Sequence, residues 1–319
     1  MSIIYAERKS PVLTPSSLAC LSHIPTINLT AGCAIGCAYC YTRGYSSHPG
    51  EGKIVLYSNL LEKLERELAA KRVKPRAVFF SPASDLFQPV DAVLELSHKV
   101  LEFFLSRGVR VTFLTKGRIP EVTMQLLLLY PEAVHAEIGL VTLDASVAEV
   151  FEPYAAGPEE RLDQMRRLVQ GGIATEARVD PILPGVTDSP DSLKQLFAAL
   201  FQAGIRRVAA STLFLRPAIA QSVWRAVGDR KEFASLLESY GRPQWLPMKA
   251  EHSLIEVLPQ EKRRDILDRA RRIAEDEGLT LSVCACKNSD IARGTCGISG
   301  LWPGPTPVSG QPRLVGLGR

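Results

Sequence analysis

The sequence predicts an α/β protein: a partial (β/α)6 TIM-type barrel with a C-terminal cysteine-bearing extension. After residue 50, strand-like and helix-like patterns alternate along the chain. With an initial strand before residue 30, six βα units can be counted. Repeated βα units form a parallel sheet, and six of them favour a barrel or partial barrel over an open doubly wound sheet. The 319 residues also leave room for an appendage beyond these units.

Each expected strand is a short apolar run, and each expected helix has apolar residues at helical spacing. The expected strands are residues 26–29, 77–81, 109–115, 137–143, 174–179 and 207–212. The expected helices are residues 60–73, 94–105, 158–170 and 189–203, with one more that begins at Pro120. Gly171 and Gly204 mark the ends of the helices 158–170 and 189–203. Beyond residue 215 this rhythm ends, and two further helices are expected at 221–237 and 260–278.

These patterns divide the chain into three parts. An N-terminal arm is expected over residues 1–25, the barrel over 26–215, and an extension with a second metal site over 216–319. The Pro/Gly-rich tail from residue 302 has little periodicity, so we expect it to lie on the surface or to pack as an extended arm.

Composition excludes several classes of protein. Hydrophobic residues make up 46% and charged residues 23%, which is typical of a globular chain and not of a disordered one. No apolar run approaches the 18 residues that span a bilayer, and the charged N-terminus does not resemble a secretory signal. We therefore expect a cytoplasmic protein with no membrane partner. The net charge of +4 is too small to indicate nucleic-acid binding by itself.

Seven cysteines are more informative than the charge. An odd number cannot pair completely, and a reducing compartment disfavours disulfides, so metal ligation is the leading interpretation. Two groups of three lie near opposite ends of the chain, which suggests two sites. Cys20 stands alone, and a lone cysteine is more often a small buried hydrophobic residue than a catalyst.

The first group, Cys33, Cys37 and Cys40, follows the first strand with the spacing C-x3-C-x2-C. Gly32 and Gly36 would let the loop wrap closely enough for three thiolates to hold three irons of a [4Fe–4S] cluster. The fourth iron would stay open to a small chelating molecule, at the end of the barrel where such folds place active sites. A zinc site with an external ligand and buried structural cysteines are the alternatives.

With Tyr39 before the third cysteine, this loop resembles the signature of the radical S-adenosylmethionine (SAM) superfamily. The resemblance implies a partial or full βα barrel and a [4Fe–4S] cluster whose open iron binds the amino and carboxylate groups of SAM. It also implies reductive cleavage of SAM to a 5′-deoxyadenosyl radical that abstracts hydrogen from a substrate. An external electron donor such as flavodoxin or ferredoxin would supply the electron.

The motifs that follow the next strands resemble the spore photoproduct lyase-like group over residues 20–215. They are Ser84-Asp85, Lys116 after Thr115, Thr142-Leu143-Asp144, and the segment 181–185. The resemblance implies that Ser84 and Lys116 contact SAM and that Tyr39 packs near the adenine; Asp85, Thr142 and Arg178 are further cofactor-binding candidates at strand ends. Pro82 stands where that family has a cysteine thought to return hydrogen to the product, and proline has no hydrogen to transfer.

The second group, Cys284, Cys286 and Cys296, has the spacing C-x-C-x9-C. Its interpretations are an auxiliary iron–sulfur cluster, a structural zinc completed by a ligand such as His252 or Asp290, and a redox-active or hydrogen-donating thiol pair. The auxiliary cluster is favoured. It could serve electron transfer or bind substrate at an open iron.

The sequence thus predicts a radical SAM enzyme. Its substrate is open: damaged or modified nucleic acid, a modified nucleotide, a peptide and a small molecule all fit. The alternative is a non-catalytic, zinc-binding nucleic-acid-binding protein. The arginines of helix 260–278 would suit phosphate, but acidic residues are interleaved with them, so ion pairs along the helix are the simpler expectation.

Overall fold

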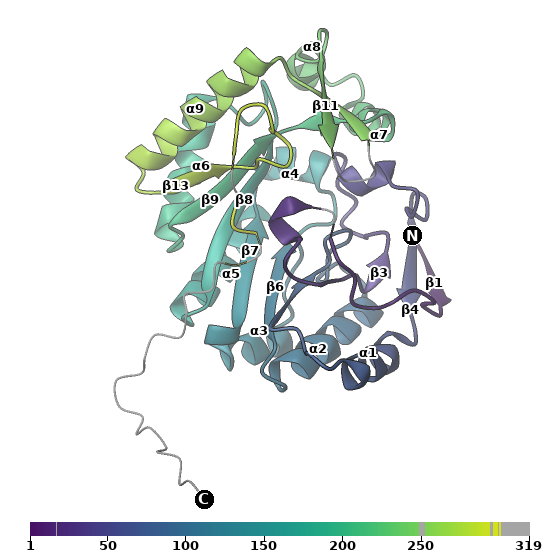
Figure 1. Ribbon diagram of the computed structural model, residues 1–319. Helices are drawn as coiled ribbons and strands as arrows, with labels where there is room; N and C mark the ends of the chain where they lie inside the picture. The colour runs from purple at the N-terminus through teal and green to yellow at the C-terminus, as the bar shows by residue number, and fades with distance from the viewer. Residues whose placement is uncertain (17, 249–252, 294–295, 299, 301–319) are drawn as a thin grey trace, which may run out of the picture.

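A curved parallel sheet of seven strands forms the centre of the computed structural model, which describes residues 1–16, 18–248, 253–293, 296–298 and 300 (Figure 1). The strands are β2 (Thr26–Ile27), β5 (Ala77–Phe80), β6 (Arg110–Thr115), β7 (Val134–Gly139), β8 (Ala174–Ile182), β9 (Arg207–Thr212) and β13 (Thr280–Val283). Their order across the sheet is β13-β9-β8-β7-β6-β5-β2, with every neighbouring pair parallel. The expected α/β partial barrel is confirmed.

All six strands expected from the sequence are present, but β7 begins earlier than predicted. It covers Val134–Gly139 instead of 137–143, and Val134 already pairs with Val111 of β6. His135 and Glu137 are buried within this strand, at 3% and 1% exposure. Because these polar residues interrupt the apolar run, the start of β7 is not visible in the hydrophobic pattern.

Helices connect the strands at the expected places. They are α1 (Leu60–Ala70), α2 (Asp91–Leu105), α3 (Glu121–Leu128), α4 (Ala145–Phe151), α5 (Pro158–Gln170) and α6 (Pro190–Gln202). Ser189 caps α6, since its hydroxyl accepts a hydrogen bond from the Ser192 backbone amide at 3.1 Å. Helix α2 packs on β6, and α5 packs on β7 and β8. The short helix α4 was not expected.

Two small sheets flank the barrel. One joins β1 (Ser2–Ala6), β4 (Lys53–Tyr57) and β3 (Thr30–Ala31); the other joins β10 (Phe214–Leu215), β12 (Ser253–Val257) and β11 (Gln244–Met248). Short 3-10 turns lie at η1 (Ala19–Leu21), η2 (Tyr41–Gly44), η3 (Pro131–Ala133) and η4 (Lys231–Phe233).

The predicted helix 221–237 is wrong, because the structure has two helices there. Helix α7 (Pro217–Val227) stops at Gly228, whose φ of 56° lies in the left-handed region that glycine tolerates. Helix α8 (Ala234–Glu238) follows, and α9 (Gln260–Asp276) confirms the last expected helix. Helix α9 packs against α6 and leads into β13, which joins the edge of the barrel sheet at β9. The expected tail from residue 302 lies outside the described residues.

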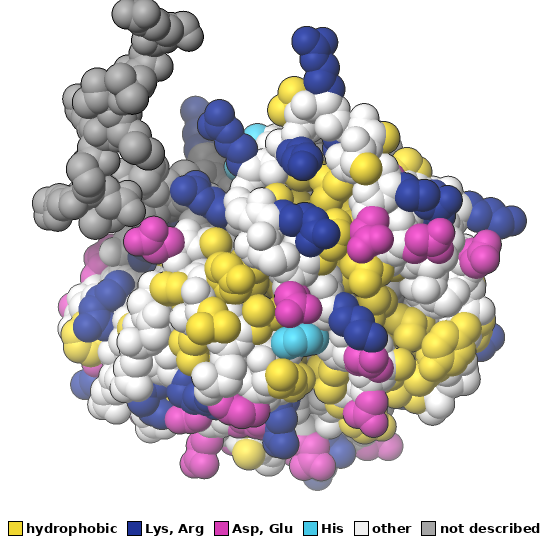
Figure 2. Space-filling view, turned by 90° about the horizontal axis from the view of Figure 1, so that it is seen from below, with side chains coloured by type: hydrophobic (Ala, Val, Ile, Leu, Met, Phe, Trp, Pro, Cys, Tyr) yellow, Lys and Arg dark blue, Asp and Glu magenta, His cyan; other side chains and the backbone are white. Residues whose placement is uncertain are grey.

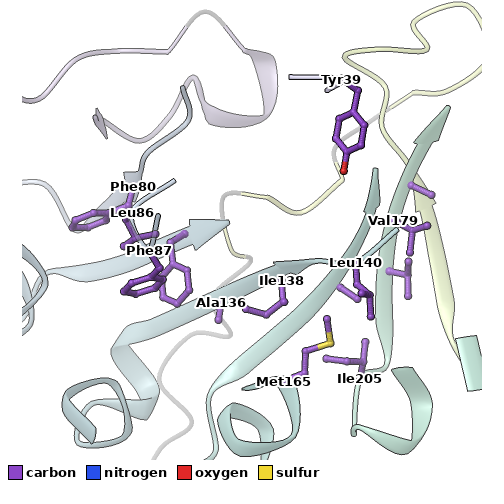
Figure 3. Close-up of a cluster of buried hydrophobic side chains, with 14 of the residues drawn as sticks. Tyr39, Phe80, Leu86, Phe87, Ala136, Ile138, Leu140, Met165, Val179 and Ile205 are labelled. Atoms are coloured by element: carbon purple, nitrogen blue, oxygen red, sulfur yellow. The ribbon is translucent and has the colours of Figure 1, made fainter. Parts of the chain in front are cut away.

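The main core fills the space between the sheet and its helices. Figure 3 shows part of it, with Ile138 and Val179 on strands and Met165 on α5. Tyr39 belongs to the same core cluster but comes from the cysteine loop after β3. The loop is therefore anchored on the core. Among the described helices, none is long and apolar enough to cross a membrane.

Candidate active site

The first cysteine group lies on a tight loop that two glycines shape. Gly32 and Gly36 have φ values of 80° and 71°, as the wrapping of this loop requires. A Cβ atom on Gly32 would lie 2.4 Å from the carbonyl oxygen of Lys53, so no other residue fits there without movement. The loop is fixed from both sides: Gln88 accepts a bond from the Ala34 amide, and the Phe151 carbonyl accepts one from the Ala38 amide, both at 2.8 Å.

Cys33, Cys37 and Cys40 line one pocket at the end of the sheet. Burial raises the pKa of the Cys33 and Cys37 thiols, while the nearby Lys116 ammonium opposes this rise at Cys37. No thiol–thiol hydrogen bond joins these three described side chains. As placed, no three His, Cys, Asp or Glu side chains within the described residues are arranged to hold a single metal ion.

The pocket is built where the parallel strands end, and it contains about 1000 Å³ of empty space including its mouth. Ser81 and Ser84 follow β5 and line it. Their hydroxyls are buried without a hydrogen-bond partner in the part of the chain that the structure describes. Unpaired buried hydroxyls are costly, which favours a polar ligand at this point. Ser81 also has a strained φ of 53°, a feature that often accompanies functional sites.

Asp85 holds the pocket wall together. Its carboxylate accepts hydrogen bonds from the Phe87 amide at 2.8 Å, the Thr115 hydroxyl at 2.7 Å and the Lys116 amide at 2.7 Å. Burial raises the pKa of Asp85, and these three donors act in the opposite direction. The predicted candidate Asp85 thus joins the turn after β5 to the end of β6.

Lys116 and Tyr39, two further predicted residues, lie together in the pocket. The Lys116 ammonium is 5.6 Å from the centre of the Tyr39 ring, a cation–π distance. It makes no ion pair among the described residues. A Cβ on Gly139 would lie 3.0 Å from the Lys116 ammonium nitrogen, so glycine at this strand end makes room for the lysine. The Tyr39 hydroxyl donates to the buried carboxylate of Glu152.

The remaining two candidates differ in their placement. Arg178 lines the pocket and is buried, with its guanidinium 2.7 Å from Glu137 and 3.1 Å from the sulfur of Cys296. It therefore connects the pocket to the second cysteine group. Thr142 does not line this pocket; its hydroxyl accepts from the Asp144 amide at 3.0 Å, at the start of α4.

The sequence patterns did not identify several charged residues that lie around the pocket. Glu152, the partner of Tyr39, forms a buried ion pair with Arg161 at 2.6 Å. Asp180 and Lys287 line the pocket and pair at 2.7 Å, which brings the C-terminal extension to the barrel. One signal in the sequence could have indicated such ion pairs: an acidic residue within an apolar strand, such as Glu137. A buried charge needs a partner of opposite charge.

The second cysteine group is brought together, and Cys20 joins it. The sulfur atoms of Cys20 and Cys286 are 3.6 Å apart. Asp290, one of the two expected fourth ligands, is instead bound to Arg263 at 2.5 Å. The other, His252, lies outside the described residues.

The comparison with protein families is decisive for the class of protein. The family model described as the radical SAM superfamily matches residues 27–208, more than half of the chain. This chain belongs to the radical SAM superfamily. Membership implies a [4Fe–4S] cluster and SAM as cofactors, and it makes the chain a radical SAM enzyme. The non-catalytic alternative is thereby set aside.

The individual relatives have low sequence identity to this chain. A protein of Pseudomonas phage M6 named radical SAM Nalpha-GlyT isomerase is 28% identical over 177 residues, which cover 55% of this chain and 36% of that protein. A mutant of spore photoproduct lyase has a TM-score of 0.68 at 15% identity, covering 88% of this chain and 82% of the lyase. The lyase complexed with dinucleoside spore photoproduct has a TM-score of 0.65 at 16% identity, over the same shares. At these identities the structures establish a shared fold.

Proposed function

We propose that this enzyme cleaves SAM reductively in the pocket at the end of the parallel sheet and abstracts hydrogen from a substrate bound beside it. The observation that carries the proposal is the convergence on one pocket of three cysteines, an ammonium and two hydroxyls, of which the ammonium has no ion pair and the hydroxyls no hydrogen-bond partner within the described residues. The cluster, when bound, supplies the electron that divides SAM into methionine and a 5′-deoxyadenosyl radical.

The chain's own residues would bind and orient the cofactors. Cys33, Cys37 and Cys40 would hold three irons, which leaves the fourth for the amino and carboxylate groups of SAM. Lys116 suits the methionyl carboxylate, because its ammonium forms no ion pair within the part of the chain that the structure describes. Ser84 offers a hydroxyl that burial leaves without a partner, and Tyr39 gives a flat surface for the adenine.

The proposal is tested by product analysis. Anaerobically reconstituted enzyme, given SAM and dithionite, should form 5′-deoxyadenosine and methionine. Omission of dithionite is the control, since cleavage needs one electron. Intact SAM after prolonged incubation of cluster-loaded enzyme would contradict the proposal.

Replacing Lys116 with alanine should weaken SAM binding while cluster iron stays constant. Loss of one charge-assisted contact costs about 1.5–3 kcal/mol, which corresponds to roughly a 10- to 100-fold higher dissociation constant. Lys287 is the matched control: it also lines the pocket beside aromatic rings, but its ammonium is paired with Asp180. Lys287→Ala should therefore change SAM affinity less. An equal effect of the two substitutions would remove the special role of Lys116.

Damaged or modified nucleic acid is the substrate class that we propose. The support is the fold shared with a lyase complexed with dinucleoside spore photoproduct. The basic helix α9 is not the expected contact surface. Arg263 pairs with Asp290 and Arg269 with Asp188, both outside the helix, while Arg271 pairs with Asp268 on the helix itself. Only one of these three pairs lies along the helix, so the expectation of ion pairs within it is met in part, but all three arginines are occupied by carboxylates. Figure 2 shows a different face, seen from below the view of Figure 1, where basic and acidic side chains are also interspersed.

DNA binding should be measured as a function of salt. We expect the enzyme to bind oligonucleotides with a dissociation constant that rises steeply with salt concentration, because phosphate contacts release counterions. Arg271→Ala serves as a control for α9 and should leave binding unchanged. Absence of binding at low salt would direct the search to peptides and small molecules.

Three further assignments belong to this proposal. The electron would come from an external donor such as flavodoxin or ferredoxin, in the cytoplasm. The barrel, residues 26–215, would carry the cofactors, while the arm 1–25 and the extension 216–319 would supply the substrate side. Cys284, Cys286 and Cys296 would hold a second metal centre, an iron–sulfur cluster or zinc.

A further inference from the structure

Four cysteines from the two ends of the chain meet beside the pocket. Cys20 lies in turn η1, Cys284 directly follows β13, and Cys286 and Cys296 lie on the loop beyond it. In Figure 1 the purple turn η1 lies close to the yellow loop after β13, in agreement with the 3.6 Å between the sulfurs of Cys20 and Cys286. The separation in sequence, 266 residues, conceals this contact.

The four cysteines form one cluster. The thiols of Cys20 and Cys286 are within hydrogen-bond distance, and Cys284 and Cys296 pack together with Cys286. Cys286 therefore links the N-terminal cysteine to the other two. The first cysteine group differs, since none of its three described thiols bonds to another.

The surroundings of this cysteine cluster stabilise thiolates, the negatively charged form of the side chain. Arg178 donates to the Cys296 sulfur at 3.1 Å, and the backbone of Ile298 also bonds that thiol. The backbone of Cys20 bonds the Cys286 thiol. Donors of this kind are typical around metal-bound thiolates, whose charge they help to stabilise. Three of the four cysteines are less than 9% exposed and Cys286 is half-buried, so most of the site is shielded from solvent.

We propose that Cys20, Cys284, Cys286 and Cys296 bind one tetrahedral metal ion, with zinc as the ion of matching chemistry. A zinc–sulfur bond of about 2.3 Å places two sulfurs of a tetrahedral site about 3.8 Å apart, close to the distance observed between Cys20 and Cys286. A [4Fe–4S] cluster puts each cysteine on a different iron and so holds the sulfurs well beyond contact.

The thiols must move to enclose the ion, because no described triad is arranged to hold one as it stands. A cysteine sulfur can move by rotation about its single Cα–Cβ bond between staggered rotamers, which is the movement that metal binding would require here.

Four protein ligands would leave no open position on this metal. The site would therefore be structural: it would tie the N-terminal arm to the C-terminal extension, and it would not bind substrate at the metal. Leu21 and Ile298 lie beside it and also line the pocket, so the metal would fix one wall of the substrate space. The inference rests on the proposed second metal centre, and its failure would leave SAM cleavage untouched.

Metal analysis of Cys20→Ser tests the site. Wild-type enzyme should contain about one zinc per chain besides cluster iron, and Cys20→Ser should lose that zinc while cluster iron stays constant. His23→Ala is the matched control, because it removes another metal-binding side chain from the same segment; it should retain zinc. Zinc that is unchanged in Cys20→Ser would overturn the role of Cys20.

A second variant separates ligand loss from misfolding. Cys20→His should keep the metal, since three cysteines and one histidine also form a zinc site. As isolated, Cys20→His should therefore contain about one zinc per chain, whereas Cys20→Ser should contain none. Additional iron and sulfide that disappear with Cys20→Ser would overturn the single ion in favour of a cluster. A disulfide between Cys20 and Cys286 in metal-free protein would overturn the metal site.

Discussion

Changing Cys33, Cys37 and Cys40 together to alanine is expected to abolish the formation of 5′-deoxyadenosine. The three thiols line the pocket and are the donors proposed for the cluster, so their removal leaves nothing to hold the irons. The measurement is 5′-deoxyadenosine released from SAM under dithionite, with iron and sulfide counted on the same samples. We expect product at the level of the reaction without enzyme.

The second cysteine group supplies the matched control for this experiment. Changing Cys284, Cys286 and Cys296 to alanine removes the same number of thiols and should leave SAM cleavage in place, because cleavage uses the first group. Product from the Cys33, Cys37 and Cys40 variant at the wild-type level would refute the assignment of the cluster site.

Replacing Asp85 with alanine is expected to destabilise the fold by about 3–5 kcal/mol. The substitution leaves the Phe87 and Lys116 amides and the Thr115 hydroxyl without their acceptor, in a place where Asp85 is only 7% exposed. Each unsatisfied buried donor costs about 1–3 kcal/mol. The shift in the urea midpoint of the cluster-loaded enzyme, followed by circular dichroism under anaerobic conditions, measures this loss.

The Asp144→Ala variant tests whether burial accounts for the large loss of stability expected for Asp85→Ala. Its carboxylate also accepts three hydrogen bonds, from the Ser146 amide and hydroxyl and the Val147 amide, but it lies on the surface at the start of α4. Water can replace it there, so Asp144→Ala should cost only about 1 kcal/mol. Equal shifts for the two variants would mean that Asp85 does not hold the pocket wall.

The barrel was predictable because its signals are local. Each buried parallel strand is a short apolar run, and Gly171 and Gly204 mark where helices end. The cysteine loop was predictable for the same reason, since its spacing lies within eight residues. The break between α7 and α8 was not, because a single glycine at position 228 is compatible with a continuing helix until its φ is known.

The rest of the site depends on contacts between distant segments. The interpretation of Cys20 as a lone cysteine followed from its position in the sequence, and only the fold brings it to Cys286. Glu152 and Asp180 carry no motif, and their partners Tyr39 and Lys287 lie more than a hundred residues away. Ion pairs and thiol contacts of this kind have no periodicity, so the hydrophobic pattern cannot locate them.

The position of β13 at the edge of the barrel sheet affects how the chain folds during synthesis. Strand β9 ends at Thr212, and its outer neighbour begins at Thr280. At about 5–20 residues per second, a ribosome needs roughly 3–14 seconds to make the chain between them. For that time the backbone groups along the outer side of β9 lack their final partner, and unpaired strand edges promote aggregation. Nascent chains that stall between α6 and β13 should therefore be the form of this protein that most needs a chaperone.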